Sequence, residues 1–384
     1  MRIFLSCQQA LRRHAVPAYA FWEYHFKNAL QEAGHEVLET PGVDWAEGLT
    51  ALSPPDRAHW LDRTWSPTVE WLRAEHARRP VELFLGYLYP FQVEPAALRT
   101  IRDLGIPAVN FFCDNVREFT RVPEPYRNFD LHWVPEAEAR RLYAAAGLRF
   151  VHAPMPVWIP PEYRQTPPAE NEDTVFLGSH DLLREDLLGA AAESGLAFKV
   201  YGNGWRSGGV EIPPAPSWSR RIGHQFAFLR EHGLRGFALR ATYQFRRRRP
   251  AAWMEKACLP ALGWADYLRA TRESRVVIGI NRYPSFRRPF SRPDRYSRLR
   301  DVEAPMLGAC YLTEAAPGLE DLYEIGAEIE TYRDAAELVE KVRGLGRDPA
   351  RRAALRRRGQ QRALADHTIG RTLEKIRAAL GQAT

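Results

Sequence analysis

Apolar positions along the chain follow two alternating patterns. Short, almost continuous apolar runs are typical of buried parallel strands, and segments in which apolar residues recur every three or four positions are typical of amphipathic helices. In the first part of the chain we expect strands at 2–6, 35–39, 81–88, 107–113, 129–134 and 150–153, and helices at 18–33, 56–78, 95–104 and 136–146. Because strands and helices alternate, this part is predicted to form a parallel sheet with helices on both faces.

The alternation is interrupted by a proline-rich segment and then begins again. Six prolines lie between positions 154 and 168, so we expect residues 156–173 to link a first domain, 1–155, to a second, 174–368. The C-terminal segment, 369–384, can pack back on the first domain. The second domain is expected to hold strands at 174–177, 198–201, 275–280 and 309–313, and helices at 182–194, 264–271, 335–345, 349–363 and, beyond it, 369–380. The predicted fold class is α/β, with two Rossmann-like domains facing a cleft.

Length and composition narrow the class of protein. A chain of 384 residues suits two domains, and no apolar run reaches the length of about 18 residues that a membrane helix needs. The N-terminal apolar run is too short for a signal peptide. The four cysteines, Cys7, Cys113, Cys258 and Cys310, are far apart, which argues against a zinc site or disulfides and favours a reducing cytoplasm. A G-x-G-x-x-G motif is absent, so a dinucleotide oxidoreductase is disfavoured.

The positive charge of the chain is local. The net charge is +7, but residues 206–250 hold ten arginines and two glutamates, and residues 282–300 hold seven arginines and one aspartate. Clustered arginines indicate an anionic partner. We call residues 206–250 the basic insertion. Its segment 222–249 interleaves aromatic residues with arginines, which suits contact with an anionic membrane surface on the inner face of the plasma membrane. The alternative is a solvated basic turn, and nucleic acid is an unlikely partner because no nucleic-acid-binding fold surrounds these charges.

The segment 298–314 combines several groups that suit a nucleoside diphosphate. Arg298 and Arg300 are expected just before a short helix, Glu303 in its first turn, and Gly308 at its end, where a left-handed conformation favours glycine. The N-terminus of a helix attracts anions, and arginines strengthen that attraction. A carboxylate one turn further on can accept hydrogen bonds from a ribose diol. The alternative is a solvated helix start with a structural glutamate.

Two further loops follow predicted strands of the second domain. Gly178, Ser179 and His180 lie between a strand and a helix, where backbone N–H groups can hold a phosphate, and Arg184 lies one turn into that helix. The alternatives are a plain turn and a surface arginine. Other candidates for donor binding are Gly202, Gly204 and Trp205 in the loop after the next strand, and Asn281 at a strand end. Trp205 can instead pack the edge of the domain.

Asp114 is the candidate for catalysis in the first domain. It follows the strand 107–113, and the C-terminal ends of strands face the ligand in this architecture. A carboxylate in this position can act as a general base on an acceptor hydroxyl. The alternative is a turn or helix-capping role for Asp114. No D-x-D motif occurs near a strand end, so we expect no metal and no cofactor.

Several motifs give the chain a family resemblance. The pattern R-x-x-E-A-P-x-x-G-A-x-x-L-T-E at 300–314, followed by P-G-L-E-D-L-Y-E-I-G-x-E-I-x-T-Y at 317–332, resembles the C-terminal domain of the CgeB-type spore maturation glycosyltransferases. V-F-L-G-S at 175–179 and K-V-Y-G-N-G-W at 199–205 match the same pattern, and F-F-C-D-N at 111–115 matches a strand end of the first domain.

This resemblance implies a GT-B fold, a nucleotide-sugar donor and hexosyltransferase-like activity. It implies that Glu303 holds the ribose. Many GT-B enzymes carry a second glutamate eight residues earlier, where this chain has Arg295. We therefore expect sugar transfer to a hydroxyl of a surface glycan, a lipid-linked glycan or a protein. The alternatives are a nucleotide-sugar epimerase of the same fold, and a non-catalytic protein that contacts membrane or nucleic acid through its basic insertion.

Overall fold

The chain forms two compact units. The computed structural model describes residues 1–14, 18–165, 170–205, 238, 252–283 and 293–381. The first unit comprises Met1–Ile159 and Ala365–Thr384, and the second comprises Pro160–Leu364. The basic insertion predicted to contact a membrane, 206–250, lies outside the described residues except for Ala238.

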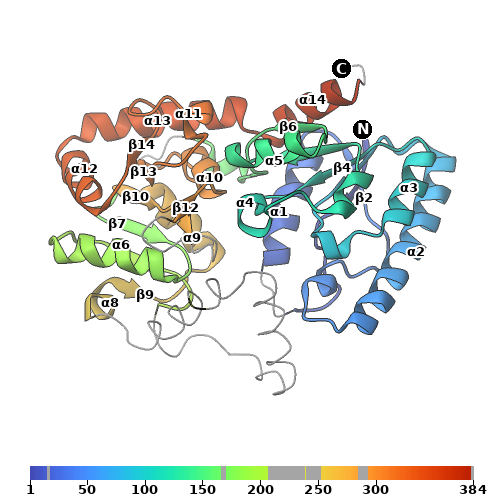
Figure 1. Cartoon of the computed structure of the whole chain (residues 1–384). Coiled ribbons are helices and arrows are strands. Elements are labelled where there is room, and N and C mark those ends of the chain that lie inside the picture. Colours follow the sequence, from blue (N-terminus) through green and yellow to red (C-terminus); the bar gives the residue numbers. More distant parts are fainter. Residues whose placement is uncertain (15–17, 166–169, 206–237, 239–251, 284–292, 382–384) are drawn as a thin grey trace. The chain divides into compact units, whose positions relative to one another are not determined.

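A parallel sheet forms the centre of the first unit (Figure 1). Its six strands, in the order β2-β1-β3-β4-β5-β6, are β1 Arg2–Ser6, β2 Glu36–Leu38, β3 Leu83–Gly86, β4 Ala108–Phe111, β5 Leu131–Val134 and β6 Phe150–His152. The helices are α1 Ala18–Glu32, α2 Pro54–Arg78, α3 Pro95–Asp103, α4 Asn115–Glu118, α5 Arg140–Ala145 and α14 Ile369–Leu380, with short 3₁₀ turns at Ala46–Leu49, Pro90–Gln92, Glu124–Asn128 and Ala137–Ala139. All neighbouring strands pair in parallel.

The strand order of the first unit indicates at which edge of its sheet a ligand would bind. Strand β1 pairs with β2 on one side and β3 on the other, so the connections run in opposite directions from β1. In such sheets ligands bind beyond the C-terminal ends of the strands near this point of reversal. Helix α14 packs against α1, β5 and β6, and Arg149 donates to the carbonyl of Ala379.

A second parallel sheet forms the centre of the second unit. Its strands, in the order β14-β13-β10-β7-β8-β9, are β7 Thr174–Leu177, β8 Lys199–Tyr201, β9 Cys258–Leu259, β10 Val276–Gly279, β13 Tyr311–Glu314 and β14 Glu330–Tyr332. Two short strands, β11 Arg282–Tyr283 and β12 Asp294–Arg295, pair antiparallel. The helices are α6 Leu182–Glu193, α8 Ala252–Ala257, α9 Trp264–Glu273, α10 Arg300–Met306, α11 Leu319–Leu322, α12 Ala335–Arg347 and α13 Pro349–Asp366, and Pro161–Tyr163 forms a 3₁₀ turn.

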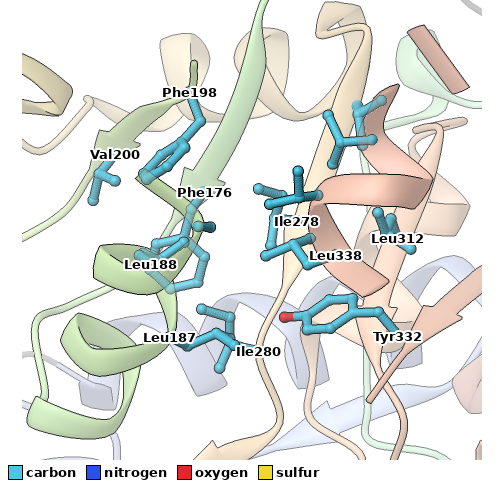
Figure 2. Packing of buried hydrophobic residues seen from close by; sticks show 14 of the residues in the cluster. Phe176, Leu187, Leu188, Phe198, Val200, Ile278, Ile280, Leu312, Tyr332 and Leu338 are labelled. Carbon is cyan, nitrogen blue, oxygen red and sulfur yellow. The ribbon is translucent and has the colours of Figure 1, made fainter. Parts of the chain in front are cut away.

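The core of the second unit lies between the sheet and the helices α6 and α12. Figure 2 shows Leu187 and Leu188 of α6 and Leu338 of α12 among the side chains packed on the strands. Apolar residues of the strands complete this core: Phe176, Val200, Ile278 and Leu312. The hydroxyl of Tyr332 donates to the carbonyl of Gly279 at 2.7 Å, and a Cβ at Gly279 would lie 2.2 Å from the hydroxyl oxygen of Tyr311. Glycine is therefore required where β10 ends.

The α/β class and the two parallel, Rossmann-like halves confirm the predicted fold class. Three local predictions were wrong. The helix predicted at 136–146 is a 3₁₀ turn, Ala137–Ala139, followed by the shorter α5. Arg300 does not precede α10 but is its first residue. The strand predicted at 309–313 begins only at Tyr311, because Gly308 (φ +73°) ends the helix in the left-handed conformation and the chain needs two more residues to extend.

Candidate functional site

The loop after β7 is held by its own hydrogen bonds. The N–H of Gly178 donates to Tyr201 at 2.8 Å, and the N–H of His180 donates to Asn203 at 2.9 Å. Asp181 caps α6, since its Oδ1 accepts from the N–H groups of Leu183 and Arg184 at 2.9 and 3.0 Å. These four N–H groups, which could have held a phosphate, are already bonded. Arg184, the cationic side chain of this segment, forms an ion pair with Asp181 at 3.0 Å.

The loop after β8 fixes the loop after β7. A Cβ at Gly202 would lie 2.0 Å from the carbonyl oxygen of Gly178, so only glycine allows this approach, and Gly204 is left-handed (φ +84°). Trp205 is buried and its Nε1 donates to the same carbonyl at 2.7 Å. His180 packs edge-on against Trp205, with its Nε2 2.7 Å from a carboxylate oxygen of Glu185. In this structure Trp205 and His180 hold the two loops together, which favours the packing interpretation of Trp205.

Three arginines from two segments converge beside this loop. Burial, together with the positive charges of Arg298 and Arg300, lowers the pKa of Arg184 to about 10, against the attraction of Asp181. Nη1 of Arg184 donates to the carbonyl of Ser179 at 2.7 Å. The guanidinium of Arg298 lies 4.8 Å from the ring centre of Tyr296. Nη1 of Arg300 is buried and has no hydrogen-bond partner among the described residues. The positive charges of Arg298 and Arg300 therefore act on the guanidinium of Arg184.

A carboxylate lies next to these arginines. Glu303 of α10 has no exposed surface, and the hydroxyl of Tyr267 in α9 donates to its Oε2. Burial raises the pKa of Glu303, whereas the positive charge of Arg300 and the hydrogen bond from Tyr267 act to lower it. The guanidinium of Arg300 also lies over the ring of Tyr267, 5.1 Å from its centre. The sequence analysis missed Tyr267, because α9 was predicted but nothing in its pattern shows which side chain meets Glu303.

A second buried carboxylate supports the start of α10. Oδ2 of Asp301 accepts from the N–H of Arg298 at 2.7 Å. Its Oδ1 accepts from the hydroxyls of Tyr311 and Thr313 at 2.8 and 2.9 Å. Burial raises the pKa of Asp301, and these hydrogen bonds counteract the shift. Asp301, also missed from the sequence, therefore holds the backbone from which Arg298 and Arg300 project.

Glu314 at the end of β13 forms a third buried acidic centre. It accepts from the guanidinium of Arg282 at 2.7 and 2.9 Å and forms an ion pair with Arg295 at 2.8 Å. Asn281, predicted to bind the donor, is buried and directs its amide inward, donating to the carbonyl of Glu314 at 2.9 Å and to Thr313 at 3.2 Å. In this structure Asn281 joins the strand ends to one another.

In the first unit, Asp114 occupies the position that precedes α4 but does not cap that helix. Its side chain accepts no hydrogen bond from the helix. Oε2 of Glu136, which follows β5, accepts the N–H of Asn115 at 3.0 Å instead. Burial raises the pKa of Glu136 to about 8, hydrogen bonds from Asn115 oppose the shift, and the charge of Asp114 adds to it. The side chain of Asp114 thus forms no capping hydrogen bond, and Glu136 is a residue that the sequence analysis missed.

The predicted donor-binding residues all belong to the second unit. They lie after β7, β8, β10 and β12, in loops or in and beside the helices α6 and α10: Gly178, Ser179, His180, Arg184, Gly202, Gly204, Trp205, Asn281, Arg298, Arg300, Glu303 and Gly308. Asp114 belongs to the first unit. Among the described residues, no group of three or more His, Cys, Asp or Glu side chains is placed to hold a metal ion.

Several solved structures share the fold of this chain. A sucrose-phosphate synthase from Thermosynechococcus elongatus is 15% identical, with a TM-score of 0.56 over 99% of both chains. A glycosyltransferase from Rickettsia africae is 8% identical, with a TM-score of 0.59 over 100% of this chain and 99% of the other. HepE from Anabaena is 13% identical, with a TM-score of 0.55 over the whole of both chains. The fold is that of the GT-B glycosyltransferases.

The sequence places the chain more closely within this class. Residues 184–378 match the family described as glycosyl transferase-like, which is half of the chain. The protein belongs to this glycosyl transferase-like family. No curated protein matches the chain.

Proposed function

We propose that the protein transfers a sugar from a nucleotide-sugar donor to a hydroxyl of a surface glycan, a lipid-linked glycan or a protein. The observation that supports this most is the convergence of Arg184, Arg298 and Arg300 beside Glu303. The three guanidiniums suit the diphosphate, and the carboxylate suits the ribose diol. Related folds point the same way, since HepE from Anabaena was solved in complex with UDP-glucose.

The chemistry required of this site is the stabilisation of a leaving group. When the bond to the sugar breaks, negative charge grows on the nucleoside diphosphate, and preorganised guanidiniums stabilise it there. We propose that these arginines fulfil this task without a metal ion. Asp114 is our proposed general base for an acceptor hydroxyl, which inversion would require. The position of Asp114 directly after the parallel strand β4 supports this role, since ligands bind beyond the C-terminal ends of such strands.

Two further parts of the proposal, the branch of the family and attachment to a membrane, are supported by the sequence. The resemblance to CgeB-type enzymes suggests that branch of the family, and the basic, aromatic insertion suggests reversible attachment of 222–249 to the inner face of the plasma membrane in the cytoplasm. Among the described residues, no helix has the length and apolarity to cross a bilayer.

The experiment that tests the proposal is a binding and turnover panel. Thermal shift and calorimetry with UDP-, GDP-, ADP- and dTDP-sugars should identify at least one donor, whose binding weakens as salt is added. When an acceptor is added together with this donor, the protein should release nucleoside diphosphate. If no nucleotide sugar raises the unfolding temperature or binds in the calorimeter, the proposal fails.

A further inference from the structure

Tyr267 occupies a fixed position near the start of α9. Its N–H donates to the carbonyl of Gly263 at 2.8 Å, and the hydroxyl of Thr271 donates to its carbonyl at 2.8 Å. The next residue, Leu268, is buried, as is Thr271, so this turn of α9 is packed onto the unit. The backbone that bears Tyr267 is therefore held in place.

The side chain of Tyr267 touches both groups that the proposed function assigns to the donor. Its hydroxyl donates to Oε2 of Glu303, and its ring lies beneath the guanidinium of Arg300 at 5.1 Å from the ring centre. The ring of Trp264 stacks on it, with centres 5.5 Å apart and planes at 17°. Tyr267 thus contacts both Glu303, which is proposed to bind the ribose, and Arg300, which is proposed to bind the diphosphate.

The hydrogen bond from Tyr267 has a fixed direction. Burial raises the pKa of the Tyr267 hydroxyl well above its ordinary value, and although Arg300 opposes the shift, Glu303 adds to it. The hydroxyl stays protonated and donates, so Glu303 acts as the acceptor. The two oxygens of a carboxylate can accept about four hydrogen bonds. The carboxylate can therefore accept from Tyr267 and from two ribose hydroxyls at once.

Glu303 is buried, so ribose binding requires some movement of the side chains that cover it. The hydroxyl of Tyr267 donates to this carboxylate, and the positive charge of Arg300 acts on it. A buried acceptor built for two hydroxyls penalises a ligand that offers only one, because the acceptor then loses water without gaining a partner.

We propose that Tyr267 is a positioning residue that orients Glu303 toward a ribose 2′,3′-diol and thereby restricts the donor to ribonucleotide sugars. This inference rests on the proposed function, and it names the substrate class of that same site: nucleoside diphosphate sugars with a 2′-hydroxyl, to the exclusion of their 2′-deoxy counterparts.

The test is calorimetry on the full chain with UDP and GDP and with 2′-deoxy-UDP and 2′-deoxy-GDP. The ribonucleotide that binds should have an affinity at least about tenfold higher than that of its 2′-deoxy form. Tyr267→Phe should lower this ratio several-fold by weakening the ribonucleotide and leaving the deoxynucleotide nearly unchanged. Tyr163→Phe is the matched control, because Tyr163 also lies beneath an arginine of this unit, Arg272, at 5.7 Å from the ring centre.

The outcomes separate the two claims. A wild-type protein that binds both forms equally, or a folded Tyr267→Phe variant with the wild-type ratio, overturns the role of Tyr267 and leaves the proposed function in place. Binding of a dTDP-sugar without binding of any ribonucleotide overturns the role of Tyr267 alone, and failure of every nucleotide to bind overturns both. If Tyr267→Phe does not fold, the test rests on two other measurements. The wild-type protein should prefer the ribonucleotide to its deoxy form, and Glu303→Gln should lose this preference.

Discussion

Asn115 donates its backbone N–H to Oε2 of Glu136 at 3.0 Å, so a residue after β5 caps α4, although Asp114 occupies the position where a capping residue normally lies. The two carboxylates follow neighbouring parallel strands, β4 and β5, at their C-terminal ends. Burial gives Glu136 a raised pKa, and its neighbour Asp114 contributes to the shift. Glu136 thus bonds to the start of α4, whereas Asp114 forms an ion pair with Arg117 at 3.9 Å.

Glu136 should make stability depend on pH. Its folded pKa of about 8 exceeds the ordinary value of 4.5, so its stabilising contribution is complete below pH 4.5 and is lost as the pH rises through 8. Between these values the free energy of unfolding should fall by up to about 1.4 kcal/mol per pH unit. Glu136→Gln should flatten this dependence in denaturant unfolding at pH 5 and pH 8.5. Glu138→Gln, a more exposed neighbour, is the control, and equal slopes for all three proteins would contradict the assignment.

Asp114→Asn should impair turnover and spare donor binding. If Asp114 deprotonates the acceptor hydroxyl, removing its charge should lower kcat by about 10²–10⁴-fold. The donor affinity measured by calorimetry should stay constant, because the proposed donor-binding residues belong to the second unit. Full activity of a folded Asp114→Asn protein would remove Asp114 from the mechanism and favour transfer with retention.

Glu303 should give donor binding a dependence on pH. Burial raises its pKa above 4.5, and only the ionised form accepts from both ribose hydroxyls, so affinity should fall with decreasing pH at a midpoint above 4.5. The groups that face it, Arg300 and Tyr267, act to lower this midpoint. Glu303→Ala should weaken binding by about 1–3 kcal/mol. UDP-glucose is a suitable ligand for calorimetry because its diphosphate stays ionised, and parallel pH profiles for wild type and Glu303→Gln would refute the assignment.

The basic insertion should bind anionic lipid. Its aromatic rings can enter a headgroup layer while each arginine near the surface contributes about 1 kcal/mol. The full chain should sediment with liposomes that contain anionic lipid and stay in solution with neutral ones. Replacement of Arg246–Arg249 by serine should release it. Binding that ignores lipid charge, or survives this replacement, would leave the alternative of a solvated basic segment.

Local sequence pattern predicted every strand of the first sheet and β7, β8, β10 and β13 of the second, because most of these strands are short, mainly apolar runs. It missed β9 and β14, because Cys258–Leu259 is only two residues long and Glu330–Tyr332 is mostly polar. It also singled out Arg184, Arg300 and Glu303, which follow strands where ligands bind in such folds. Tyr267, Asp301 and Glu136 were missed for a common physical reason. Their partners Glu303, Tyr311 and Asn115 lie 36, 10 and 21 positions away, so these contacts depend on how the elements pack rather than on any local motif.

The central claim is that Arg184, Arg298 and Arg300 form the diphosphate site, and calorimetry with UDP and uridine tests it most directly. Arg184→Gln and Arg300→Gln should each weaken UDP by about tenfold or more and change uridine little, because a charge-assisted hydrogen bond to phosphate contributes about 1.5–3 kcal/mol. Arg343→Gln, an exposed arginine of α12, should alter neither. The salt dependence of UDP binding should also decrease in the two site variants. Equal losses for UDP and uridine, or undiminished UDP binding in both site variants, would contradict the account.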